Sequence, residues 1–586
     1  MPWNRSRKII VVAIALVLGA AAGCVWWYMR APQRVDMARY VPESALAFFE
    51  IDSVPRVASG LTSTEAWKSL AGPLGLSSQL DYAGSATDVL GRLGLGPDDV
   101  VALGRAQVCL VLTGMEAGAE PSPETDESAA TIVIRPKFAL VVKTHTSEST
   151  AKQLAETRVR MLARRAYGEQ VVVEESDYGG ARIRLARGPS EGRQMVWTSI
   201  GDVVVIGNDL DALRAVLDAG AERAPSLAGS FLLTKLRAEL DADSGDVFAY
   251  FSRAGVSKIV GVGPGVIAGT ITADADRMVT VSRLVGSVSE GLIQAMAYCG
   301  TVTGGRVVDR YFAIFAPRVD EAMTQSIRPQ TADQSVLDVI PAAARDVTVV
   351  RIERPGESLQ ALLTTISSRV DAAVAVTIGQ FAIEARRSYG VTPEVPVSPL
   401  LGDGVAFADL GDDGPVVAVF EVRDQAGLLA IVERYLRDES SRISSETYAS
   451  VEILKSSNED GRAASFLGRY LVLGTRDQIV RCIDARAAGT VMSTGALHAD
   501  IAAHPATILA SQRVEPQEAA ELLVALSGAV RATDGSADLA ERPDIRDAAR
   551  ALAPTISRSE LRNGGVYTET TSAVGNFSYL TTLLSD

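Results

Sequence analysis

The distribution of hydrophobic positions along this chain starts with one long apolar run at residues 9–29. The run contains no charged residue, and about 20 helical residues at 1.5 Å each suffice to cross a hydrocarbon core of about 30 Å. Amphipathic aromatic rings and basic side chains favour the interface between membrane and water. Such interface anchors close the run: Trp26, Trp27, Tyr28 and Arg30. The pattern predicts a cytoplasmic tail at 1–8, a transmembrane helix at 9–29 and a juxtamembrane linker at 30–39.

The positive charges on the two sides of the run indicate its orientation. Three precede it and three follow it closely, so the α-amino group tips the balance toward an N-terminus inside the cell. We expect a single-pass signal anchor in the cytoplasmic (inner) membrane, with the bulk of the chain extracytoplasmic. Two alternatives use the same residues: cleavage after Ala20-Ala21-Ala22, or lipidation of Cys24.

Beyond the linker, apolar strand patterns and helix patterns recur in the same order. Five landmarks are repeated, which is typical of a chain built from copies of one structural unit. They pair 40–51 with 339–350, 138–143 with 416–421, 201–208 with 468–475, 246–253 with 506–513, and the hairpin turn Gly304-Gly305 with Gly564-Gly565. The repeat predicts two tandem copies of one unit, at 40–316 and 336–586, joined by a linker at 317–335 that contains Pro317 and Pro329.

The order of elements within each copy favours an α+β fold. Strand patterns follow one another directly, and turns such as 178–180 are typical of antiparallel hairpins. We expect each copy to have a mainly antiparallel sheet covered by helices. The acidic, Pro- and Ser-containing stretch at 116–129 has no counterpart in the second copy and predicts a solvated loop.

Composition and charge narrow the class of protein. Hydrophobic residues make up 47% of the chain and charged residues 22%, as in folded globular proteins. A net charge of −14 without a dense basic stripe argues against a nucleic-acid partner. Outside the apolar run, Cys109, Cys299 and Cys482 lie in apolar contexts, which predicts buried thiols, with a Cys109–Cys299 bridge as the alternative.

No motif that would carry catalysis is complete. Ser149 and Lys152 have S-x-x-K spacing without its companion motifs, so we interpret them as the first turn of a helix. The stretch 241–246 lacks the bidentate Glu of a calcium loop and predicts a tight turn. The histidines form no metal-binding pair; they are His145, His498 and His504. We predict no catalytic, cofactor-binding or metal-binding residue, and no cofactor.

The proline-led opening strand (VPESALAFF, 41–49) and the strand-Gly-helix element at 201–213 accompany the apolar N-terminal run. Together they resemble a bacterial domain-of-unknown-function family of single-pass, membrane-anchored envelope proteins. The resemblance covers most of the chain, although its motifs are structural. It implies a periplasmic location and gives no catalytic residues to carry over.

These patterns favour a non-enzymatic, membrane-anchored extracytoplasmic protein that serves as a binding or scaffold module. We expect contact with the lipid bilayer through 9–29 and an envelope protein, peptide or glycan as partner. One alternative is an envelope hydrolase with Asp or Glu chemistry, which predicts a cleft with two close carboxylates. Another is a lipid-binding protein, which predicts an apolar cavity.

Overall fold

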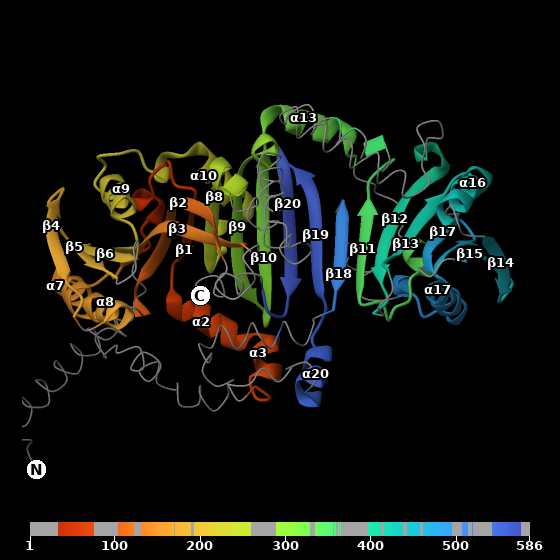
Figure 1. Cartoon of the computed structure of the whole chain (residues 1–586), viewed down its shortest axis with the longest axis horizontal. Coiled ribbons are helices and arrows are strands. Elements are labelled where there is room, and N and C mark those ends of the chain that lie inside the picture. The colour runs from red at the N-terminus through yellow and green to blue at the C-terminus, as the bar shows by residue number, and fades with distance from the viewer. Residues whose placement is uncertain are drawn as a thin grey trace, which may run out of the picture.

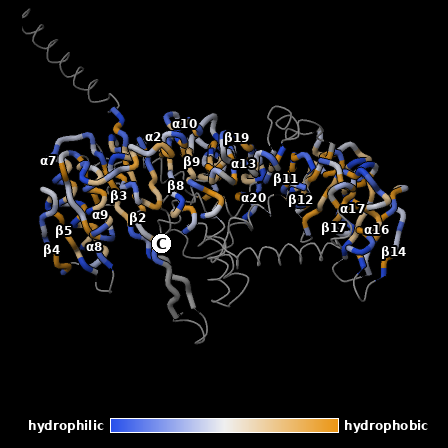
Figure 2. Tube along the Cα trace, turned by 90° about the horizontal axis from the view of Figure 1, so that it is seen from above, coloured by the Kyte–Doolittle hydropathy of each residue, from blue (hydrophilic) through white to orange (hydrophobic). Residues whose placement is uncertain are grey.

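A computed structural model shows the strands side by side along the long axis of the molecule (Figure 1). Hydrophobic segments of the chain occur in both halves (Figure 2). The structure describes residues 33–74, 104–121, 130–168, 170–188, 193–258, 289–328, 335–354, 357–358, 361, 364, 397–411, 415–437, 442–457, 461–494, 507–513, 519 and 542–575.

Twenty strands of the described residues form a single sheet, and each neighbouring pair is antiparallel. The pairings place the strands, from one edge to the other, as β4 (Val173–Tyr178), β5 (Ala181–Arg187), β6 (Gln194–Ile200), β7 (Val203–Gly207), β3 (Ala130–Lys143), β2 (Gln107–Pro121), β1 (Ala47–Ile51), β8 (Val247–Ser252), β9 (Ile293–Thr303), β10 (Arg306–Phe315), β20 (Gly565–Ser572), β19 (Thr555–Arg562), β18 (Ile508–Gln512), β11 (Asp346–Arg351), β12 (Leu401–Asp409), β13 (Val417–Val422), β17 (Tyr470–Thr475), β16 (Arg462–Leu467), β15 (Val451–Ser456) and β14 (Ile443–Tyr448).

From each edge toward the centre of the sheet, the strands of the two halves follow one another in corresponding order. The first half ends at β10 and the second half at β20, and these two strands join the halves through eight directly opposed residue pairs. The hairpin turns beside the joint have similar backbones. Gly304 and Gly305 have φ angles of 61° and 81°, and Asn563 and Gly564 have 50° and 82°. The joint therefore brings corresponding strands of the two halves together.

Helices cover parts of both faces and ends of the sheet. α13 lies at the upper end of the central strands, while α3 and α20 pack together at the lower end (Figure 1). The described helices are α2 (Val54–Ser63), α3 (Glu65–Leu70), α7 (Glu148–Gln153), α8 (Arg160–Tyr167), α9 (Leu210–Gly220), α10 (Phe231–Leu240), α13 (Pro317–Ser326), α16 (Gln425–Leu436), α17 (Arg476–Ala488) and α20 (Pro543–Arg550), with the π-helical segment η3 (Leu154–Val159) between α7 and α8.

Helix starts follow from local sequence. Asp209 precedes α9 and its side chain accepts from the backbone N–H of Ala212 at 2.9 Å. Thr475 and Gln478 form a reciprocal capping box at the start of α17. Such caps satisfy backbone donors that the first helical turn leaves without a partner. These two helices are thereby fixed where each follows its strand, β7 or β17.

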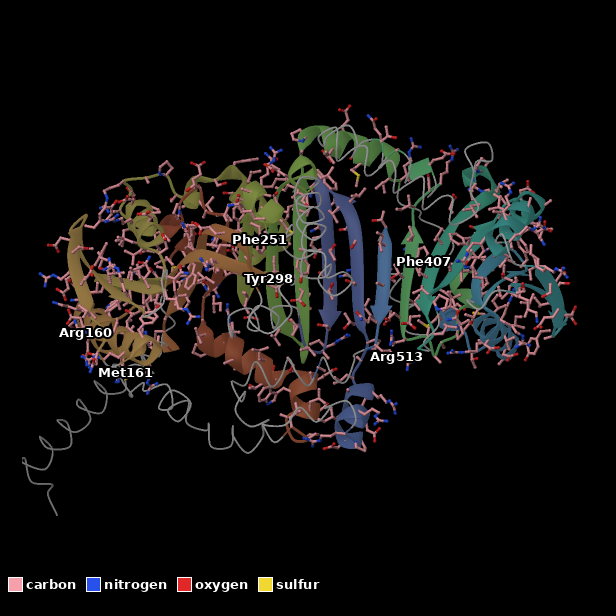
Figure 3. The ribbon with its side chains drawn as sticks, viewed as in Figure 1. Arg160, Met161, Phe251, Tyr298, Phe407 and Arg513 are labelled. Carbon is pink, nitrogen blue, oxygen red and sulfur yellow. The ribbon has the colours of Figure 1, made fainter. Side chains whose placement is uncertain are left out.

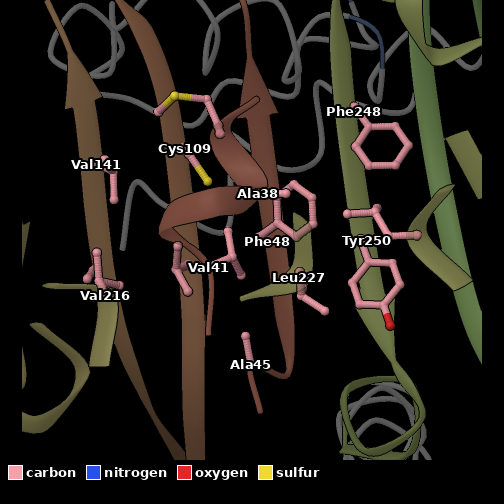
Figure 4. Close-up of a cluster of buried hydrophobic side chains, with 14 of the residues drawn as sticks. Ala38, Val41, Ala45, Phe48, Cys109, Val141, Val216, Leu227, Phe248 and Tyr250 are labelled. Atoms are coloured by element: carbon pink, nitrogen blue, oxygen red, sulfur yellow. The ribbon is translucent and has the colours of Figure 1, made fainter. Parts of the chain in front are cut away.

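The largest core of the first half lies between the sheet and the helices α9 and α10. Aromatic and aliphatic side chains of neighbouring strands converge there, with ring centroids of Phe48 and Phe248 5.9 Å apart (Figure 4). The second half has its own core beneath α17. Phe251 on β8 and Tyr298 on β9 belong to a smaller cluster beside α2, and Phe407 lies on β12 in the second half (Figure 3).

The predicted fold class is wrong about the sheet. The structure has one antiparallel sheet that runs through both halves, in place of two units with a sheet each. The transmembrane helix predicted at 9–29 lies outside the described residues, and no helix within the described ranges is both long and apolar enough to cross a bilayer. The boundaries of the predicted units stay predictions.

Two local predictions also need correction. Strand β2 continues to Pro121, so the start of the predicted solvated loop at 116–129 is part of a long hairpin with β3. The hairpin in the second half turns at Asn563-Gly564, one residue earlier than predicted, because Gly565 already pairs with Ile314 of β10. A shift of one residue exchanges the two faces of a strand.

Candidate functional site

The residues singled out from the sequence do not assemble into one site. The interface anchors Trp26, Trp27, Tyr28 and Arg30 lie outside the described residues, as do His498 and His504. Ser149 lies in the first turn of α7, where Ser147 caps the helix, in agreement with the interpretation as an ordinary helix start. The stretch 241–246 forms a tight turn, with Asp241 in the left-handed conformation (φ 49°).

The three cysteines outside the apolar run are buried free thiols. Burial raises the pKa of Cys482 to about 12 and the pKa of Cys299 to about 11. Thiols at such pKa values are protonated and weakly nucleophilic at neutral pH. The predicted buried thiols are confirmed, and the alternative bridge between Cys109 and Cys299 is not formed.

A charged cavity of about 210 Å³ in the first half is the best candidate site. It lies where the chain enters the fold at 34–36, against β1, β8, α10 and the turn after α10. Small-molecule sites usually occupy about 300–1,000 Å³, so this cavity suits a small group or one side chain of a partner. Its charged lining comprises Asp36, Glu50, Asp52, Asp243, Asp246, Arg34 and Arg237.

Arg237 on α10 connects two carboxylates in this cavity. Its Nη1 donates to Asp36 Oδ1 at 2.9 Å, and its Nη2 donates to Glu50 Oε2 at 2.8 Å. Its guanidinium carbon also lies 5.4 Å from the centre of the Phe248 ring. Only 11% of the Glu50 side chain is exposed, against 45% for Asp36. The strand therefore supplies a buried carboxylate and the entering segment supplies an exposed one.

Glu50 has a strongly shifted pKa. The pKa is raised from 4.5 to about 7: burial is the largest cause, Arg237 opposes it, and the nearby carboxylates of Asp52 and Asp36 add to the rise. Desolvation therefore outweighs the ion pair, because removing a carboxylate from water costs more than one guanidinium returns. Glu50 exchanges a proton near neutral pH, as groups at functional sites commonly do.

The side chain of Gln107 binds the segment 34–36 to the sheet. This side chain, on β2, accepts from the N–H of Val35 at 2.8 Å and donates to the carbonyl of Val35 at 3.1 Å. The same amide nitrogen donates to Asp52 at 2.9 Å, and Asp52 forms an ion pair with Arg34 at 2.7 Å. His145 Nε2 contacts the Gln107 oxygen at 2.9 Å, and burial lowers the pKa of this histidine. The cavity wall at 34–36 is thus held by the hydrogen bonds of Gln107 and by the ion pair of Arg34.

The second half does not repeat this chemistry. Glu50 lies between Cys109 of β2 and Phe248 of β8. At the corresponding place Val349 lies between Ala406 of β12 and Leu509 of β18, and its side chain is 3% exposed. An apolar residue there packs without a desolvation cost. The fold therefore does not require a carboxylate at this position, and Glu50 is specific to the first half.

Sequence reasoning missed this site. One signal was present, since Glu50 interrupts the apolar strand pattern AFFEI at 47–51. Its partners are distant in the chain, with Arg237 on a helix that follows 187 residues later. Among the described residues, no group of three or more His, Cys, Asp or Glu side chains is placed to hold a metal ion.

Comparisons with known proteins leave the class of protein open. No protein-family profile, curated protein or solved structure matches this chain.

Proposed function

We propose that this protein is a non-enzymatic binding or scaffold protein of the bacterial cell envelope. In this proposal it is attached to the cytoplasmic membrane through residues 9–29, with the sheet on the extracytoplasmic side. The observation that carries the binding function is the charged cavity of the first half, at a place where the second half has Val349. A buried carboxylate that the fold does not need is most simply explained by a ligand.

The charge balance of the cavity favours a positively charged group of a peptide or protein partner. The lining contains five carboxylates and two guanidinium groups, and Arg56 nearby neutralises Asp246 at 2.8 Å. Negative charge therefore remains in excess, and a lining of one sign attracts ligand charge of the other sign. A lysine side chain fits the available volume of about 210 Å³. The lipid-binding alternative gains no support from this cavity, because its lining is charged.

Binding can be tested with a short cationic peptide. The full chain in detergent is titrated with tetralysine amide and with tetraglutamate by calorimetry. We expect tetralysine alone to bind, and Glu50→Gln to weaken its binding at least fivefold at pH 8. The matched control is Glu446→Gln on β14, which removes a carboxylate outside the cavity that is held by two cations, Lys455 and Arg476. Equal binding to both variants, or none to the native chain, would contradict the assignment of this cavity.

Membrane attachment is tested separately. We expect the native chain to stay with the membrane fraction after alkaline carbonate extraction and to be degraded by protease added to spheroplasts. A chain that is extracted by carbonate, or is protected in spheroplasts, would refute the proposed location without bearing on the cavity.

A second candidate function is hydrolysis, which one observation favours. Glu50, with a pKa of about 7, lies in one cavity with the carboxylates of Asp36 and Asp52, and a carboxyl group that exchanges a proton near neutral pH can act as a general acid or base. The purified chain would then release soluble products from isolated envelope glycan or peptide, and Glu50→Gln would abolish that release. Equal release by both proteins excludes Glu50 as the acid or base.

A further inference from the structure

The joint between the two halves pairs two strands that correspond to each other. Arg310 follows Gly305 of the first hairpin turn by five residues, and Glu569 follows Gly564 of the second by five. These two residues lie directly opposite each other in the register of β10 and β20. The local twofold relation of the joint therefore passes through this pair.

The central pair is an ion pair of limited exposure. Arg310 Nε lies 3.2 Å from Glu569 Oε2, and the two side chains are 24% and 14% exposed. Glu569 also accepts from the hydroxyl of Tyr567 at 2.8 Å and pairs with Arg558 of β19. Arg310 and Glu569 occupy corresponding positions of the two halves, yet their side chains carry opposite charges.

Pairing with a second copy of the chain would place a residue opposite its own copy only at this central position. If β10 paired with β10 of another copy about the same centre, Arg310 would face Arg310, whereas every other residue would face a different residue. Pairing of β20 with β20 would place Glu569 against Glu569. Like charges directly opposite each other destabilise a strand pair. In the native joint the flanking pairs include Tyr311 with Thr568 and Val308 with Thr571, which are uncharged, and Asp309 faces the uncharged Thr570.

We propose that β10 and β20 are pairing surfaces for a second copy of this chain as well as for each other, and that the Arg310–Glu569 pair directs the pairing to within one chain. The proposal is independent of the charged cavity. An unpaired strand edge is a general template for other chains, and a repeated chain offers two edges of similar shape. The ion pair makes the intended match favourable and the two self-matches unfavourable.

The experiment refolds two differently tagged copies of the full chain together, from denaturant, in excess detergent. Capture of one tag then measures how much of the other copy is retained. We expect little retention for the native chain and for the exchanged variant Arg310→Glu/Glu569→Arg. The neutral variant Arg310→Gln/Glu569→Gln should retain at least threefold more. The control is Arg187→Gln/Glu174→Gln, which removes an ion pair between β5 and the edge strand β4.

Retention by the neutral variant at the native level would overturn the proposal, as would equal retention by the control. If the neutral variant does not refold, the midpoints of denaturant unfolding of the charge-reversal variants decide. Arg310→Glu and Glu569→Arg should each lower the midpoint, and the exchanged double variant should recover part of the loss of Glu569→Arg, because that substitution also removes the ion pair with Arg558. No recovery in the double variant would equally overturn the proposal.

Discussion

At the scale of single residues, Glu50 shows how a strand can hold an ionisable group against the cost of burial. Its neighbours in the sheet are Cys109 and Phe248, which cannot solvate a carboxylate. Arg237 offsets part of that cost, yet the pKa still rises to about 7. The residue therefore lowers the stability of the fold at neutral pH, which is typical of a position retained for function.

The raised pKa of Glu50 predicts how stability depends on pH. The folded chain keeps this proton up to a pH of about 7, while the unfolded chain releases it near 4.5. The free energy of unfolding therefore decreases between these pH values, by at most about 3 kcal/mol for this group. Chemical denaturation at pH 5 and pH 8 should show a smaller decrease for Glu50→Gln than for the native chain.

Glu446→Gln is the control for this measurement. The cations around Glu446 lower its pKa, so the carboxyl does not titrate between pH 5 and pH 8. This variant should keep the native decrease. An unchanged decrease in Glu50→Gln would show that other groups cause the pH dependence.

At the scale of elements, the sequence indicated the strands, caps and turns better than their register. The strand at 47–51 and the cap of α17 follow from alternation and from residue type. The second hairpin was predicted one residue late, because two adjacent glycines at 564–565 have the pattern of a turn in either position. What decides the register is the close contact of Gly565 with β10, and a contact between distant segments leaves no local pattern.

That contact predicts different effects of substituting two glycines near the joint. A Cβ on Gly565 would lie 2.2 Å from the carbonyl oxygen of Ala313, so Gly565→Ala must move β20 away from β10. Gly304 corresponds to Asn563 of the second turn, and the two have similar backbone conformations. Gly304→Asn therefore introduces the residue type of the other turn, and its added Cβ has open space around it. Gly565→Ala should cost about 1–3 kcal/mol of stability and Gly304→Asn less than about 0.5 kcal/mol, as measured by chemical denaturation. Equal losses would contradict this account.

At the scale of the whole molecule, the two halves share backbone hydrogen bonds across β10 and β20. The repeated order of landmarks did not predict this joint, because the joint depends on the pairing of two strands whose opposed residues lie more than 240 positions apart. The charged cavity escaped prediction for the same reason, since Glu50 and Arg237 meet only after folding. Local patterns therefore defined elements, while the joint and the site depended on distant contacts.

The shared joint predicts that the halves unfold together. Strands β7 and β17 lie on opposite sides of the joint, and hydrogen exchange followed by mass spectrometry reports on both. In the native chain their amides should become exposed at the same denaturant concentration, because opening one half breaks the central pairing. In Gly565→Ala the two transitions should separate. Separate transitions in the native chain would show that the joint does not couple the halves.

The joint also imposes an order in time on synthesis. The ribosome makes β10 roughly 250 residues before β20, which at about 5–20 residues per second leaves an interval of about 10–50 s. During that interval β10 has no β20 to pair with, and nascent chains on the same messenger RNA present identical strands. Arg310 is already part of each of them, whereas Glu569 has not yet been made. Repulsion between arginines would therefore act on neighbouring nascent chains before the native partner of β10 exists.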